Sequence, residues 1–261
     1  MEKQMIIFNN RFINNIATYI VQFDTDSQSE ILGQVSAYFA RNQVKHNRIN
    51  PDSYNRQGFH NMRIINNATY QPLSYAIGLK GLQKVNITNN LFGDNQLDYE
   101  LLAGIKTAKI DNTVNVVRNW WGSSDPRRIK ERIFDFDDWN SYAIASYRPY
   151  LLKDDFEAPI SVGYEPESPL TIDNLGGRLM HELTLYYRTQ PYIIKSDLTI
   201  MPNAQLTIAP GAEIEFYPSV GILALGPLIA QGTPEEPIKM RPIQLHKMED
   251  ITGQKMQRME E

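Results

Sequence analysis

One pattern of apolar and polar positions recurs through the first half of the chain. A short run of β-branched residues is followed by one or two asparagines and then often by another apolar residue, as in residues 6–12 and 85–92. The last asparagine of each copy is at Asn10, Asn47, Asn67, Asn90 and Asn119, at intervals of 37, 20, 23 and 29 residues. Intervals of about 20–30 residues are typical of stacked solenoid coils, and the interval of 37 requires a long loop or a degraded coil.

This pattern predicts an all-β fold, a right-handed parallel β-helix. Alternate side chains of each short strand point inward, so that Ile, Val, Leu and Phe stack on the same position one coil away. Asparagine tolerates the left-handed backbone of a sharp corner, and stacked asparagines can form a hydrogen-bonded ladder. We therefore predict that the five asparagines are structural corners rather than ligand contacts.

The first β-helix, residues 1–122, is expected to end at a pair of tryptophans. Trp120 and Trp121 can cover the end of the core, and the Gly122 that follows permits a turn. A Ser-Asp-Pro sequence then predicts a helix over 127–134, which would place Ile129, Ile133 and Phe134 on one face. Residues 123–152 are therefore predicted to be a helical capping segment, with Trp120, Trp121 and Trp139 as capping side chains.

The second half of the chain predicts a second β-helix. Residues 153–190 are expected to form a linker and an entry strand. Residues 153–169 have the prolines, glycine and acids of a linker, Gly176-Gly177 is expected to be a turn, and a strand is expected from His181 to Tyr187. Residues 191–243 alternate as short strands separated by Pro-Gly and Gly-Thr-Pro turns, which predicts the opening coils of another β-helix. Residues 244–261 lose this alternation and are expected to be a tail.

The N-terminus and the length of the apolar runs bear on whether this is a whole protein. The repeat begins at the N-terminus without a polar cap, so we expect the first coils to be absent and the chain to be part of a larger protein. The apolar run near Met1 has four residues, too few for a signal peptide, and no run approaches the roughly 20 residues of a membrane span.

Several motifs resemble known families. Residues 119–122, 132–139 and 147–151 resemble the end of a β-helix repeat in the pectin-lyase-like superfamily. A more specific set resembles the extracellular β-helix modules of the bark beetle (Anakonda) family, which are large single-pass insect adhesion proteins of tricellular septate junctions. That set comprises Gly176–Leu179, Leu198–Ile200, Leu206–Ala212, Ile214–Phe216 and Leu228–Thr233.

The resemblance implies a non-catalytic extracellular scaffold at cell junctions. Its partners would be other cell-surface proteins or a second copy of itself. The family also carries scavenger-receptor cysteine-rich modules, a membrane span and a cytoplasmic tail. This chain has no cysteine and no apolar span, so membrane attachment would depend on parts of a larger protein.

Composition excludes several other classes. With no cysteine, the chain has no disulfide framework, no thiol chemistry and no zinc site of the cysteine type. A formal charge of -4 gives no basic excess for nucleic acid or an anionic membrane. Apolar residues at 42% and charged residues at 21% are typical of a globular chain.

An alternative hypothesis is a carbohydrate-binding or polysaccharide-degrading β-helix, because many β-helices are polysaccharide lyases or hydrolases. Hydrolysis of a glycosidic bond would need two carboxyl groups about 5–10 Å apart. The candidate groups lie in the predicted capping helix rather than on a repeated strand face, which favours a solvated charged surface: Asp135, Asp137, Asp138, Arg127, Arg128 and Arg132. The 14 tyrosines could stack on sugars or cover coil ends. A third hypothesis is a degraded gene product without a role of its own.

No catalytic, cofactor-binding or metal-binding residue is predicted, and no cofactor. The four histidines are scattered without the spacing of metal ligands: His46, His60, His181 and His246. Two sequons, Asn67-Ala-Thr69 and Asn86-Ile-Thr88, are candidate glycosylation sites in a secreted protein.

Overall fold

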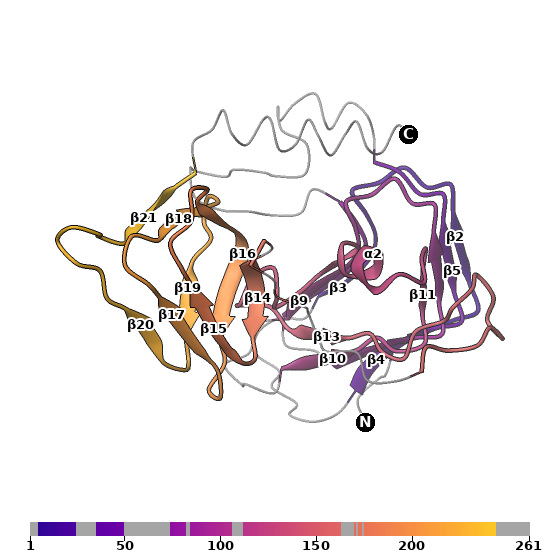
Figure 1. The fold of residues 1–261 in the computed structure, drawn as a ribbon. Coiled ribbons are helices and arrows are strands. Elements are labelled where there is room, and N and C mark those ends of the chain that lie inside the picture. The colour runs from indigo at the N-terminus through magenta and orange to yellow at the C-terminus, as the bar shows by residue number, and fades with distance from the viewer. Residues whose placement is uncertain are drawn as a thin grey trace. The chain divides into compact units, whose positions relative to one another are not determined.

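The computed structural model describes residues 5–24, 35–49, 74–81, 84–105, 112–162, 170, 172–173 and 175–243. Nearly all regular elements in this part of the chain are strands (Figure 1). The chain divides into two compact units, residues 1–165 (unit 1) and residues 166–261 (unit 2). The two units are described separately below.

Unit 1 is a stack of coils with three parallel sheets (Figure 1). Three coils contribute one strand to each of these sheets, and a fourth coil adds a strand to the second and third sheets only. Every strand pair in these sheets is parallel, which confirms the predicted parallel β-helix. The first sheet contains β1 (Met5–Phe8), β4 (Val35–Ala40) and β7 (Lys84–Thr88). The second contains β2 (Arg11–Ile13), β5 (Gln43–Lys45), β8 (Leu91–Gly93) and β11 (Trp120–Trp121). The third contains β3 (Tyr19–Asp24), β6 (Tyr75–Gly81), β9 (Tyr99–Ile105) and β12 (Ile133–Phe134).

The core of unit 1 consists of rows of inward side chains. Along the second sheet the strand registers align Phe12 with Val44, Val44 with Phe92, and Phe92 with Trp121. Val44 and Phe92 are fully buried, and the Phe92 and Trp121 rings stack with centroids 5.0 Å apart. Each such side chain stabilises the stack by about 1.5–3 kcal/mol through burial.

The predicted capping helix is shorter than expected. Helix α2 spans Pro126–Lys130, and Asp125 caps it by accepting a hydrogen bond from the Arg127 amide. The prediction that the helix continues to Phe134 is wrong, because Ile133 and Phe134 pair with Leu101 and Leu102 and complete the third sheet. Residues 123–152 also contain β13 (Ile144–Ser146), which pairs in parallel with β10 (Thr113–Asn115).

Residues 153–162 do not form a free linker. Asp154 binds Lys45 at 2.6 Å, and Glu157 binds Arg41 at 3.3 Å, so this segment lies against strands of the second coil of unit 1. An antiparallel bridge between Leu151 and Ile160 closes it into a loop. We call residues 153–162 the outer strap; residues 163–169, also predicted to be linker, lie outside the described residues.

Unit 2 is a second stack of parallel strands. One sheet contains β14 (Leu175–Leu179), β16 (Tyr192–Ile200), β18 (Glu213–Phe216) and β21 (Lys239–Pro242), with β19 (Ile222–Ala224) beside β16. The other contains β15 (Glu182–Leu185), β17 (Gln205–Ile208) and β20 (Leu228–Ala230). The core of unit 2 includes Ile194, Leu206 and Ile214. The stack therefore begins at Leu175, before the residue 191 expected from sequence.

The predicted turn at Gly176-Gly177 is wrong. Both glycines lie within β14, at a shift of register against β16. A Cβ on Gly176 would collide with Ser196 Oγ unless that side chain moved, and Gly177 has a φ of 76°, so residues with a Cβ would form this bulge only under strain. The predicted tail, residues 244–261, lies outside the described residues.

Candidate functional site: two asparagine ladders and a buried ion cluster

The first asparagine ladder of unit 1 contains Asn10, Asn42, Asn90 and Asn119. From Asn42 onward, each side-chain carbonyl oxygen accepts two hydrogen bonds from the preceding asparagine, one from its backbone N and one from its Nδ2. These distances are 2.8 and 3.1 Å at Asn42, 2.9 and 3.2 Å at Asn90, and 2.8 and 2.9 Å at Asn119. Asn42, Asn90 and Asn119 are fully buried, so the ladder satisfies polar groups inside the stack.

A second ladder contains Asn15, Asn47 and Asn95, joined by the same two bonds at 2.8–3.0 Å. An ion pair ends it: Asn95 Nδ2 donates to Glu100 Oε2 at 2.8 Å, and Arg132 Nη2 donates to Glu100 Oε1 at 2.9 Å. Burial raises the pKa of Glu100, and Arg132 opposes that rise. The carboxylate thus takes the place of the carbonyl that another coil's asparagine would provide.

The structure does not place the five predicted corner asparagines in one series. Asn10, Asn90 and Asn119 share the first ladder, whereas Asn47 belongs to the second, and Asn67 lies outside the described residues. Sequence reasoning missed Asn42, Asn15 and Asn95. The missed signal is an asparagine pair five residues apart, which recurs at 10/15, 42/47 and 90/95.

The left-handed corner residue is the one before each ladder asparagine. Positive φ angles of 52–59° occur at these seven positions: Asn9, Asn14, Arg41, His46, Asn89, Asp94 and Arg118. The expectation that the ladder asparagine itself adopts this backbone is therefore wrong. The preceding residue makes the bend, and the ladder asparagine directs its amide and side chain along the stack.

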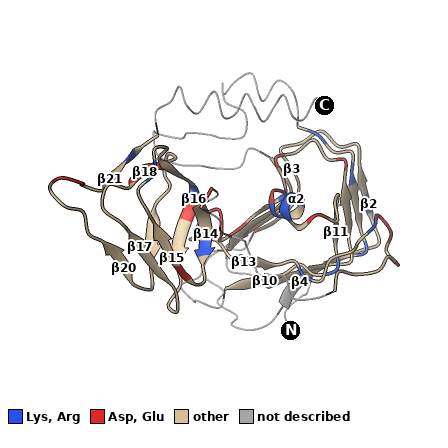
Figure 2. Cartoon of the chain, viewed as in Figure 1, with Lys and Arg blue, Asp and Glu red and all other residues tan. Residues whose placement is uncertain are grey.

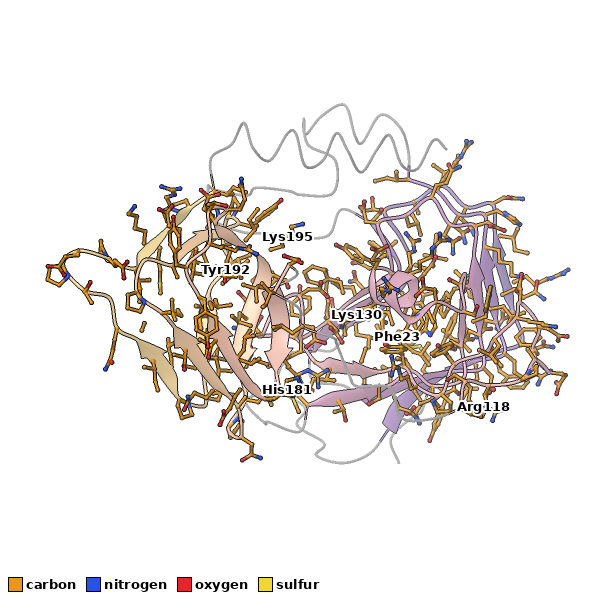
Figure 3. All side chains as sticks on the ribbon, viewed as in Figure 1. Phe23, Arg118, Lys130, His181, Tyr192 and Lys195 are labelled. Atoms are coloured by element: carbon orange, nitrogen blue, oxygen red, sulfur yellow. The ribbon has the colours of Figure 1, made fainter. Side chains whose placement is uncertain are left out.

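The predicted charged surface is a buried ion cluster instead. Asp135 and Asp137 are 1% and 5% exposed, and Lys130 Nζ lies 2.5 Å from Asp135 Oδ1 and 3.1 Å from Asp137 Oδ2. Lys130 is labelled on α2 in Figure 3. Asp135 Oδ2 accepts a hydrogen bond from the Ala145 amide, and Asp138 Oδ2 accepts one from the Asp135 amide. These carboxylates therefore fix the backbone that follows α2.

The cluster shifts the titration of its members. Burial raises the pKa of Asp138 to about 7 and also raises the pKa of Asp135, while Lys130 opposes both shifts. Burial acts to lower the pKa of Lys130, but Asp135, Asp137 and Asp138 outweigh it, so the pKa rises above its ordinary value.

The geometry does not fit hydrolysis of a glycosidic bond, which needs two carboxyl groups about 5–10 Å apart facing the substrate. Asp135 accepts hydrogen bonds from Lys130 and two backbone amides, and Arg132 is paired with Glu100. The other two arginine candidates, Arg127 and Arg128, are exposed on α2, whose Lys and Arg positions are blue in Figure 2. Within the described residues, no group of three or more His, Asp or Glu side chains could hold a metal ion.

The three tryptophans lie in different environments. Trp121 is buried at the end of the core, whereas Trp120 points to the opposite face of β11 and is half-buried. Trp139 stacks on Tyr142 with centroids 5.3 Å apart, in a cluster with Phe134 outside the third sheet. The cluster includes Tyr75, which is 6% exposed, so these rings pack on one another rather than form an open platform for sugars.

Two of the four histidines lie in the part of the chain that the structure describes, one in each unit. His46 occupies a left-handed corner with Nδ1 3.9 Å from Asp94 Oδ2, and His181 is exposed in unit 2. His60 and His246 lie outside the described residues.

Of the two sequons, Asn86-Ile87-Thr88 lies in β7, and Asn67 lies outside the described residues. Val85 and Ile87 point into the core, at 2% and 0% exposure, so Asn86 and Thr88 point outward.

The chain is similar to protein bark beetle of Drosophila melanogaster, with 40% identity over 247 residues. The match covers 93% of this chain but only 8% of the length of that protein. No protein-family model matches the chain, and no solved structure matches it. In the part of the chain that the structure describes, none of the helices has the length and apolar character needed to cross a membrane.

Proposed function

We propose that this chain is a non-catalytic extracellular module of an adhesion scaffold that organises tricellular septate junctions. The observation that carries the proposal is the 40% identity to protein bark beetle over 93% of the chain. The family resemblance of the strand and turn motifs implies the same role. The partners would be other cell-surface proteins or a second copy of the module.

The architecture supports a mechanical rather than a chemical role. Polar side chains that could have provided chemistry are instead bonded within the stack, as at Asn90, Asp135 and Arg132. A solenoid in which each coil contacts its neighbours gives an extended surface of fixed shape. Such a surface suits a spacer or contact module between membranes better than it suits catalysis.

Localisation tests the proposal. Residues 231–237 form an exposed loop of unit 2, so an antibody to this peptide should bind the folded protein. Staining of unpermeabilised epithelium that expresses the protein should give signal at cell vertices, and excess free peptide should remove it. Signal that appears only after permeabilisation would contradict the extracellular role.

Incubation of the purified chain with pectin and related polysaccharides tests the non-catalytic part. No new reducing ends and no unsaturated products are expected. Turnover that persists after removal of contaminating enzymes would instead favour a polysaccharide-degrading β-helix.

A further inference from the structure

We infer that Asn86 carries an N-linked glycan whose first sugar covers Tyr38 on the outer face of the first sheet of unit 1. The inference rests on the proposed function in one respect, because the modification requires passage through the secretory pathway.

The side chains of the sequon residues Asn86 and Thr88 point outward and are partly exposed. Asn86 and Thr88 point away from the core because Val85 and Ile87 occupy the inward positions of β7. Among the described residues the Asn86 amide has no hydrogen-bond partner, and it is half-buried. The ladder asparagines differ, since the Asn90 amide donates to Phe39 O, Thr88 O and Asn119 Oδ1.

Apolar side chains share the outer face of this sheet with Asn86. The strand registers place Ile6, Tyr38 and Asn86 in one outward row, and Phe8, Ala40 and Thr88 in the next. Ile6 is 66% exposed and Phe8 is 56% exposed, so this face offers apolar area to water. Neighbouring strands lie about 4.8 Å apart, which brings the Tyr38 ring within reach of a sugar on Asn86.

The transfer forms one bond and breaks another. Asn86 Nδ2 attacks the anomeric carbon of a lipid-diphosphate oligosaccharide, and a C–N bond replaces the C–O bond to the diphosphate. The lipid diphosphate leaves with the electron pair, and the amide proton passes to a base of the transferase. The Thr88 hydroxyl completes the sequon that the transferase recognises. The C–H face of the attached sugar can then pack on the Tyr38 ring.

The first test measures occupancy. The full chain is secreted from insect cells behind a cleavable leader, in an Asn67→Gln background so that the other sequon does not contribute. Peptide mapping should find a glycan at Asn86 in this background and in Thr88→Ser, which keeps the sequon. The glycan should be absent from Asn86→Gln and from Thr88→Val, which keeps the shape of threonine without its hydroxyl. A secreted chain with unmodified Asn86 would overturn the inference.

The second test concerns Tyr38. Enzymatic removal of the glycan should lower the thermal midpoint of the secreted chain, and the decrease should be smaller in Tyr38→Ala. Equal decreases would overturn the placement of the sugar on Tyr38. Because the leader is supplied, a native protein confined to the cell interior would contradict the proposed function without changing these results, and unmodified Asn86 would leave the proposed function standing.

Discussion

Asparagine suits the ladders of unit 1 because its side chain carries both a carbonyl acceptor and an amide donor. Asn90 uses both, since its carbonyl receives two bonds from Asn42 and its amide donates to Asn119. Aspartate would supply no donor, and stacked carboxylates would repel one another inside the stack. The ladder therefore depends on the amide at each buried position.

Replacing Asn90 with alanine should leave several buried polar groups without hydrogen-bond partners. We expect Asn90→Ala to lower the free energy of unfolding by about 2–4 kcal/mol, because each unsatisfied buried polar group costs about 1–3 kcal/mol. Chemical denaturation monitored by circular dichroism measures this loss.

Asn10→Ala is the matched control. Asn10 is exposed, and the Asn42 carbonyl keeps its bond from the backbone amide of residue 10. We expect a loss of roughly 0.5–1 kcal/mol. Similar losses in the two variants would contradict an energetic role for ladder burial.

At the scale of elements, Asp138 in the turn after α2 makes the stability of the folded chain depend on pH. The pKa of Asp138 rises from 3.8 to about 7 in the folded chain. The folded state therefore holds this proton more tightly than the unfolded state does. The stability that the proton contributes is complete below about pH 4 and is lost as the pH rises through 7.

Asp138→Asn removes this titration but keeps an oxygen to accept the bond from the Asp135 amide. We expect the decline in stability between pH 4 and pH 7 to be smaller in the variant than in the parent chain. Denaturant titrations at several pH values measure it. The exposed Asp155→Asn serves as control, and identical pH profiles for Asp138→Asn and the parent would disprove the assignment.

The outer strap provides two ion pairs of different burial. Lys45 and Asp154 are 15% and 45% exposed, whereas Arg41 and Glu157 are 43% and 79% exposed. Double-mutant cycles with alanine should give a coupling energy of about 0.5–1 kcal/mol for the first pair and roughly 0.2 kcal/mol or less for the second. A larger coupling at Arg41 would show that burial does not set the strength of these contacts.

At the scale of the whole molecule, the two units have separate cores. The buried cluster of unit 1 includes Phe92 and Trp121, that of unit 2 includes Leu206 and Ile214, and none of the described residues belongs to both. We expect two thermal transitions in calorimetry. Asn90→Ala should lower one midpoint and Leu206→Ala the other. A single transition that both substitutions shift would show that the units unfold together.

The sequence predicted the parallel β-helix because inward positions repeat within each coil, as at Phe12, Val44 and Phe92. It predicted the coil spacing less well, since the ladders connect residues 32, 48 and 29 positions apart. The longest interval, from Asn42 to Asn90, includes residues 50–73, which lie outside the described residues.

The buried ion cluster could not be predicted from local sequence. Asp135 and Asp137 next to Lys130 have the spacing of a solvated helix face, and only the pairing of Ile133 and Phe134 with β9 turns the carboxylates inward. Glu100 and Arg132 meet for the same reason, although 32 residues separate them. Such contacts depend on the stacking of coils, which spacing along the chain does not reveal.

The outer strap also constrains the order in which unit 1 folds. Its contacts join residues 109 and 116 positions apart, whereas neighbouring ladder asparagines are at most 48 positions apart. Closing a longer loop costs more chain entropy, and Lys45 is in place for Asp154 only after the intervening coils have formed. Closure of the strap is therefore expected to be the last step of folding in unit 1, and until it occurs a nascent stack exposes the outer side of its second sheet.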